Sequence, residues 1–133
     1  MQPYLSMAGN NAWANATLYT ALSDLDAAAF AAPSPGFFGS LKATLNHIYE
    51  VDLYYLDALA EGGRGRSVYD REEGDTVAPL AARQAEQDQR LIIFCRTRTA
   101  DDLTRRVTTE RKGGPVSERI DHLLLHLFQH QVH

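Results

Sequence analysis

The sequence predicts an all-α protein with the architecture of a four-helix bundle. Apolar residues recur at helical spacing through four long segments, and proline, glycine and small polar residues mark the connections between them. The chain has 133 residues, of which 44% are hydrophobic, and this suits a single core. We therefore expect one domain over residues 1–133, in which the helices bury their apolar faces against one another. An irregular helical domain with the same elements is the alternative.

The first helix is expected over about residues 7–22. Its candidate core positions are Trp13, Leu18, Ala21 and Leu22. Residues 23–26 are suited to capping a further turn, and the proline- and glycine-containing run 33–36 then breaks the helix.

The second helix is expected to begin near Ser40, a favourable N-cap residue, and to run to about Ala60. Gly62 and Gly63 are expected to end it. A polar loop over about residues 61–75 follows. Its length is notable, because compact domains seldom keep about 15 residues without secondary structure unless those residues have a use.

The third helix is expected over about residues 78–99, with Pro79 tolerated in its first turn. Residues 103–115 contain β-branched residues followed by two glycines and a proline. This pattern fits either a short hairpin or an irregular crossover.

The last helix is expected to begin near Ser117. Its apolar pattern persists to Val132 and His133 without a capping glycine or a proline. We therefore expect the native helix to continue past the last residue given, so that this helix is truncated here.

Charge and hydropathy exclude two classes of partner. The formal net charge is −4, which argues against a general nucleic-acid binder, because such proteins neutralise phosphates with lysine and arginine. The locally basic stretch 96–112 is interpreted as solvated surface. The N-terminus lacks the basic start of a secretory signal, and no run of about 18 apolar residues predicts a membrane span. We expect no nucleic acid and no membrane as partners.

Cys95 is the only cysteine. It cannot form an intramolecular disulfide, which fits the cytoplasmic location that we expect. The neighbouring Leu91, Ile92 and Phe94 indicate a buried thiol, and a catalytic nucleophile is the alternative interpretation.

The last helix carries four histidines on one side. They are His122, His126, His130 and His133. When each residue advances about 100°, they fall within an arc of about 80°, beside a sector of leucines and Phe128. His130 lies at the edge of this predicted buried face, whereas His122 faces solvent most. Neutral imidazole is the commonest protein ligand of zinc and also suits nickel, so the cluster indicates a metal site. An exposed histidine-rich face is the alternative.

His47, in the second helix, is the only histidine outside this cluster. The predicted inward line of that helix is His47, Val51, Tyr54 and Ala58, and the predicted outer side is marked by Asn46, Glu50 and Asp57. An inward histidine on one helix can meet an inward-edge histidine on another, as in the metal sites of helical bundles. A hydrogen-bonded interior or surface histidine is the alternative for His47 alone.

Three short motifs carry a family resemblance. They are Asn11-Ala12-Trp13-Ala14-Asn15, Leu45-Asn46-His47-Ile48 and the run 126–133. In this order and spacing, which cover nearly the whole chain, they resemble the DinB-like (damage-inducible) superfamily of metal-dependent proteins. The resemblance implies a four-helix bundle, often a homodimer, with three histidines that hold one divalent metal ion, Ni or Zn.

By position, the resemblance implies that His47 and His130 are the first two metal ligands. The third ligand of the family lies four residues after the second, one position beyond His133. Either the native chain continues and completes the triad, or His126 or His133 substitutes for the third ligand. Some relatives use low-molecular-weight thiols as co-substrates, and many others have no known reaction.

Our first hypothesis is therefore a metal-dependent enzyme acting on a small molecule, of the thiol-dependent transferase or hydrolase type. The metal would activate a thiolate or a water. Glu50 and Tyr54 are candidates to supply a hydrogen bond or a proton, although surface and core roles are favoured for them. Arg64 and Arg66 are candidates to receive an anionic substrate, with solvated loop charges as the favoured role. No catalytic residue is assigned. The alternatives are a non-catalytic metal- or ligand-binding helical dimer and a structural dimer whose histidines only pack.

Overall fold

The computed structural model describes residues 3–33, 39–71 and 76–131, the last of these without the side chain of Gln131. Its four long helices are α1 (Pro3–Ala21), α3 (Leu41–Leu59), α4 (Val77–Arg96) and α6 (Ile120–Gln131). The shorter elements are α2 (Ala27–Ala31), η1 (Gly65–Asp70), α5 (Ala100–Thr104), β1 (Arg106–Arg111) and β2 (Gly114–Arg119). The prediction of a mainly helical protein is confirmed. Within the described residues, no helix is both long enough and apolar enough to cross a membrane.

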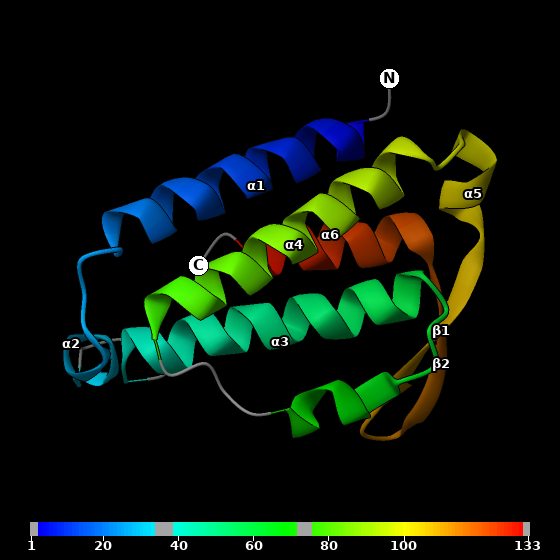
Figure 1. Ribbon diagram of the computed structural model, residues 1–133. Coiled ribbons are helices and arrows are strands. Elements are labelled where there is room, and N and C mark those ends of the chain that lie inside the picture. The colour runs from blue at the N-terminus through cyan, green and yellow to red at the C-terminus, as the bar shows by residue number, and fades with distance from the viewer. Residues whose placement is uncertain (1–2, 34–38, 72–75, 132–133) are drawn as a thin grey trace.

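The four long helices pack in the order α1, α4, α3, α6, and α6 in turn contacts α1. Figure 1 shows that α3 and α4 run in the same direction, whereas α1 and α6 run in the opposite one. Two consecutive parallel helices need a connection that returns along the bundle. The segment between α3 and α4 makes this return, and η1 packs against α3 on the way. The long polar loop is therefore a crossover, and it has secondary structure of its own.

The core consists of two hydrophobic clusters. The larger cluster lies near the hairpin end of the bundle and includes Leu59, Leu91, Leu123 and Leu124. The smaller cluster lies toward the other end and includes Tyr19, Phe30, Leu45 and Leu80. The buried polar residues between these clusters along the helices are Asp52 of α3 and Gln84, Gln87 and Asp88 of α4.

The predicted core of the first helix is wrong at three of its four positions: Leu22 packs against the smaller cluster, but Trp13, Leu18 and Ala21 are exposed. Trp13 is 68% exposed and Leu18 is 40% exposed. The buried residues of α1 are instead Ala8, Asn11 and Tyr19. The reason is that α1 packs on α4 partly through asparagine side chains that bond to a buried carboxylate, so its inner face is not marked by apolar residues alone.

The boundaries of α3 confirm the capping prediction at one end and correct it at the other. Ser40 is the N-cap, and its hydroxyl accepts a hydrogen bond from the Ala43 N–H. At the C-terminus, Glu61 takes the left-handed conformation with φ of 56°, where a glycine was expected. The Gly62 N–H donates to the Asp57 carbonyl and the Glu61 N–H to the Ala58 carbonyl, which is the Schellman pattern. These two bonds stabilise a conformation that glutamate alone disfavours.

The segment before the last helix is a hairpin, which confirms one of the two predicted alternatives. β1 pairs with β2 in antiparallel register from Arg106 opposite Arg119 to Arg111 opposite Gly114. Ser117 lies in β2, opposite Thr108, and does not begin the last helix. α6 starts at Ile120 because strand pairing continues to Arg119. A weak capping signal could not reveal this strand pairing.

Candidate metal centre

The antiparallel packing of α3 on α6 brings His47 and His130 together. Their Nε2 atoms are 3.4 Å apart. The two ring centroids are 5.2 Å apart, and the ring planes are inclined by 53°. Both histidines are partly buried. The structure thus places the two residues that the sequence singled out in direct contact.

The other histidines of α6 lie as helical periodicity predicts. Leu123, Leu124, Leu127 and Phe128 are all buried, so the apolar sector faces the core. His122 and His126 are exposed. His133, the other proposed substitute for the third ligand, lies outside the described residues. His130 is therefore the histidine of α6 that stands at the edge of the core in this part of the chain.

The inward line of α3 is confirmed, but its predicted outer side is partly wrong. Val51, Tyr54 and Ala58 are buried beyond His47, as expected. Asn46, expected on the outer side, is only 1% exposed. The crossover covers it, because Arg71 donates from its guanidinium to Asn46 Oδ1 over 2.9 Å.

Arg71 also holds Glu50, one of the two candidates for a proton-transfer group. Its Nε lies 3.7 Å from Glu50 Oε1, and both side chains are largely shielded from solvent. The guanidinium lies over the Tyr49 ring at 4.7 Å from the centroid. Glu50 is therefore an ion-paired residue beneath the crossover, not the open surface carboxylate that was favoured.

Tyr54, the other candidate for proton transfer, links α3 to the β1–β2 hairpin. Its hydroxyl donates to the Glu110 carbonyl of β1. Its ring stacks on Tyr69 of η1, with centroids 5.7 Å apart. Burial raises the pKa of Tyr54 above its usual value, so it remains a neutral hydrogen-bond donor. The core role favoured for Tyr54 fits these contacts.

Arg64 and Arg66 are exposed in the crossover. Their backbone N–H groups donate to Asp57 and Glu110 respectively, over 3.0 and 3.2 Å. These hydrogen bonds hold the backbone of the loop in place, and the two guanidinium groups remain near the surface.

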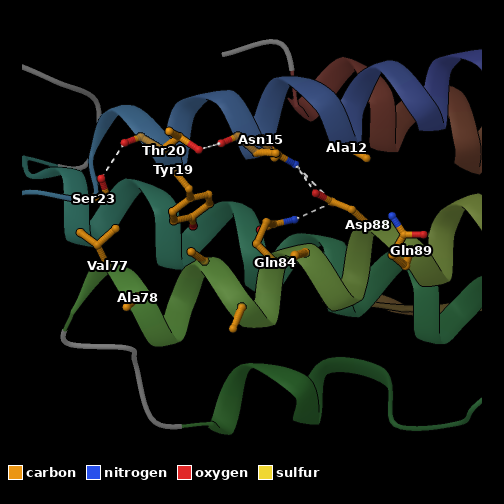
Figure 2. A pocket seen from close by; sticks show the side chains of 14 residues that line it. Ala12, Asn15, Tyr19, Thr20, Ser23, Val77, Ala78, Gln84, Asp88 and Gln89 are labelled. Atoms are coloured by element: carbon orange, nitrogen blue, oxygen red, sulfur yellow. Dashed lines mark hydrogen bonds between the residues drawn. The ribbon is translucent and has the colours of Figure 1, made fainter.

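A buried polar network joins α1, α3 and α4, and sequence reasoning missed it. Asp88 accepts from Asn15 over 3.0 Å, and Gln84 Nε2 donates both to Asp88 over 3.0 Å and to Asp52 over 2.8 Å. Figure 2 shows the Asn15, Gln84 and Asp88 side chains converging between α1 and α4. Burial raises the pKa of Asp88, and the bonds from Gln84 and Asn15 oppose that rise.

A signal for this network was present in the sequence. Gln84, Gln87 and Asp88 interrupt the line from Leu80 to Leu91 at helical spacing, and all five are buried. Polar residues on an apolar stripe indicate buried polar contacts, since an unpaired buried polar group is costly.

A comparison with protein-family models finds one that spans the chain. The model of the DinB family matches residues 1–133. The chain belongs to the DinB family. The family resemblance inferred from three short motifs is thus confirmed over the full length of this DinB chain. No curated protein matches the sequence.

The described residues of this DinB chain hold two members of the expected ligand triad. Within residues 3–33, 39–71 and 76–131, no group of three or more His, Cys, Asp or Glu side chains is placed to hold a metal ion. The donor set formed by His47 and His130 consists of two imidazoles, which suit zinc and nickel. These two residues fit part of such a site, and a third ligand is needed for the three that open metal sites usually have.

Proposed function

We propose that this DinB protein binds one divalent metal ion, Ni or Zn, through His47 and His130. We further propose that it acts in the cytoplasm as a metal-dependent enzyme on a small molecule, of the thiol-dependent transferase or hydrolase type. The single observation that carries the proposal is the approach of His47 Nε2 to within 3.4 Å of His130 Nε2.

This separation suits two ligands of one ion. Zinc–imidazole bonds are about 2.0–2.1 Å long, and a tetrahedral angle between two such bonds puts the nitrogens about 3.3–3.4 Å apart. Two neutral imidazoles without a metal can also share a hydrogen bond at a similar distance, so metal binding needs a direct test. The family resemblance puts the third ligand one position beyond His133, and His126 or His133 is the proposed substitute within the given sequence.

A bound Zn or Ni would lower the pKa of a coordinated thiol or water. The chain's own contribution is to hold the two imidazoles in place. Leu127 and Phe128 are buried beside His130 on α6, and Val51 is buried one turn after His47 on α3. Because these neighbours are packed in the core, the histidines are held on rigid elements, as a functional site requires.

A non-catalytic metal- or ligand-binding dimer is the second candidate. It is favoured because the two nearby candidates for proton transfer, Tyr54 and Glu50, are already bound to other groups. The Tyr54 hydroxyl donates to the Glu110 carbonyl, and Glu50 is paired with Arg71. Neither group is held ready to move a proton at the histidines.

Elemental analysis of untagged protein tests metal binding. The 133-residue chain is compared with a form extended past His133, because the family resemblance puts the third ligand there. About one Zn or Ni ion per extended chain is expected, with weaker retention by the 133-residue form if the third ligand lies outside it. His47→Ala and His130→Ala should each lose the ion, since each removes one ligand.

His122→Ala is the matched control, because it removes a histidine of the same helix whose side chain is 64% exposed. It should retain the metal fully. Equal loss in this control would indicate nonspecific binding to a histidine-rich surface. His126→Ala tests the substitute ligand, and loss of metal in that variant alone would move the site away from His47. Absence of metal from every form after incubation with Zn and Ni would refute the proposal.

A measurement of turnover distinguishes the enzyme hypothesis from the non-catalytic binding hypothesis. Metal-loaded protein is incubated with a low-molecular-weight thiol and an activated aryl chloride, and separately with ester and amide substrates. An enzyme should give product at a rate that falls in His47→Ala and not in His122→Ala. Full metal occupancy with no turnover on any of these classes would favour the non-catalytic alternative.

A further inference from the structure

Two buried oxygen atoms between α1 and α4 make no hydrogen bond in the structure. They are the Tyr19 hydroxyl and Gln84 Oε1. Tyr19 is 7% exposed and Gln84 is 1% exposed. Buried polar atoms nearly always have a partner, because desolvation without a hydrogen bond costs free energy. These two atoms therefore indicate a missing partner.

The two residues face each other across the helix interface. Asn15 of α1 bonds to Asp88 of α4, and the two helices are antiparallel. One turn further along α1 is Tyr19, and one turn back along α4 is Gln84. Figure 2 shows the Tyr19 side chain extending from α1 into the space beside Gln84. Both residues line one hollow of about 540 Å³ between the helices.

Rotation of the Gln84 amide would not satisfy its oxygen. Gln84 Nε2 donates to Asp52 Oδ2 and to Asp88 Oδ1 over 2.8 and 3.0 Å. Exchanging the amide N and O would bring Oε1 against two carboxylate oxygens and lose both bonds. The amide is therefore fixed with its oxygen turned away from the carboxylates.

We infer that an ordered water molecule binds between α1 and α4, at the base of this hollow, and bonds to both the Tyr19 hydroxyl and Gln84 Oε1. A water can donate to the amide oxygen and either donate to or accept from the hydroxyl. Both oxygens are buried, so a partner that reaches them must be small, and a water is small enough. Globular proteins of this length hold about five buried waters, which typically bind such otherwise unsatisfied groups.

The proposed water site differs from the candidate metal centre in its ligand atoms and in the helices that supply them. Its partners come from α1 and α4, whereas His47 and His130 come from α3 and α6. Through Gln84, the water would extend the network that already links α4 to Asp52 of α3 and to Asn15 of α1. The packing of α1 on α4 would then be partly water-mediated.

A high-resolution crystal structure of the 133-residue chain tests the inference directly. We expect a density peak at about 2.7–3.2 Å from both oxygens. The absence of a peak, or a direct bond from the Tyr19 hydroxyl to Gln84, Asp52 or Asp88, would overturn the inference. Growth of crystals in rubidium chloride adds a check, since an anomalous peak at this position would identify a cation instead of water.

Tyr19→Phe gives a second test with opposite outcomes. If a water satisfies the hydroxyl, the variant loses a hydrogen bond, and its unfolding equilibrium constant should rise about three- to tenfold in urea titration. If the hydroxyl is dry and unpartnered, its removal should stabilise the protein, and that result would contradict the inference. Tyr69→Phe is the control, because Tyr69 is 38% exposed and should change stability little.

Discussion

At the residue scale, the two histidines of the candidate site were each identified by their place on a helix. Periodicity put His130 at the edge of the apolar face of α6, and the observed burial of Leu123 and Leu127 bears this out. Periodicity also put His47 on the inward line of α3. What periodicity could not supply was the contact itself, because the residues are 83 positions apart and meet only when α3 and α6 pack.

Cys95 gives a prediction at the same scale. The residue is fully buried, and burial raises the pKa of its thiol to about 11. Because the thiolate is the reactive form, native protein at pH 8 should react slowly with a thiol reagent, and unfolded protein should react fast. The measurement is the rate of labelling with and without denaturant. Rapid labelling of the native protein would show that the thiol is accessible, as a nucleophile would need to be.

The same thiol should make stability depend on pH. The folded state holds the Cys95 proton more tightly than the unfolded state, whose thiol titrates near its usual value of 9.0. The contribution of the protonated thiol to the free energy of unfolding is therefore fully present below about pH 9 and is lost as the pH rises toward about 11. It amounts to about 2–3 kcal/mol. In Cys95→Ala, the free energy of unfolding should lose the part of its pH dependence that comes from the thiol and keep the part that comes from tyrosines. Identical pH profiles of stability for the two proteins would contradict the prediction.

At the scale of elements, the N-termini of α3 and α4 show that a residue suited to capping a helix does not always form the cap hydrogen bond. Ser40 and Thr76 are both N-cap residues with side chains of the kind that caps helices. Ser40 accepts a hydrogen bond from Ala43, whereas Thr76 makes no side-chain cap bond. The residue type indicates a helix start in both cases, but it does not decide whether the side-chain cap bond forms.

The two caps form a matched pair for mutation. Ser40→Ala should lower the free energy of unfolding by about 1 kcal/mol, because it leaves an N–H of the first turn of α3 without its partner. Thr76→Ala should change it much less. Urea titration monitored by circular dichroism measures both values. Equal effects of the two substitutions would show that the Ser40 bond contributes nothing measurable.

At the scale of the whole molecule, α1 presents an outer face without charge. The first charged residue of the chain is Asp24, which follows α1. Trp13 is 68% exposed on this helix. Interfaces between proteins are depleted in charge and enriched in tryptophan at their centres. We propose that the homodimer expected from the family resemblance uses this face.

Trp13→Arg should therefore weaken or abolish the dimer, because it places a charge at the centre of the proposed interface. Sedimentation velocity or light scattering at several concentrations gives the oligomeric state. Ile93→Arg is the control, since Ile93 is 54% exposed on α4 and lies on a different helix. Loss of the dimer in the control alone would place the interface on α4, and a monomeric wild-type protein would remove the proposal.

The sequence alone determined the helical class, the approximate span of α3 and α4, the cap at Ser40, the buried face of α6 and the two candidate ligands. These features depend on local spacing and on the chemistry of single residues, which the sequence carries directly. The tertiary structure alone decided that α1 buries Asn11 and exposes Trp13, that Arg71 covers Asn46, and that β2 delays the start of α6. Each of these depends on a partner in another segment of the chain. Burial and pairing are properties of two packed surfaces, and periodicity within one helix cannot specify the other surface.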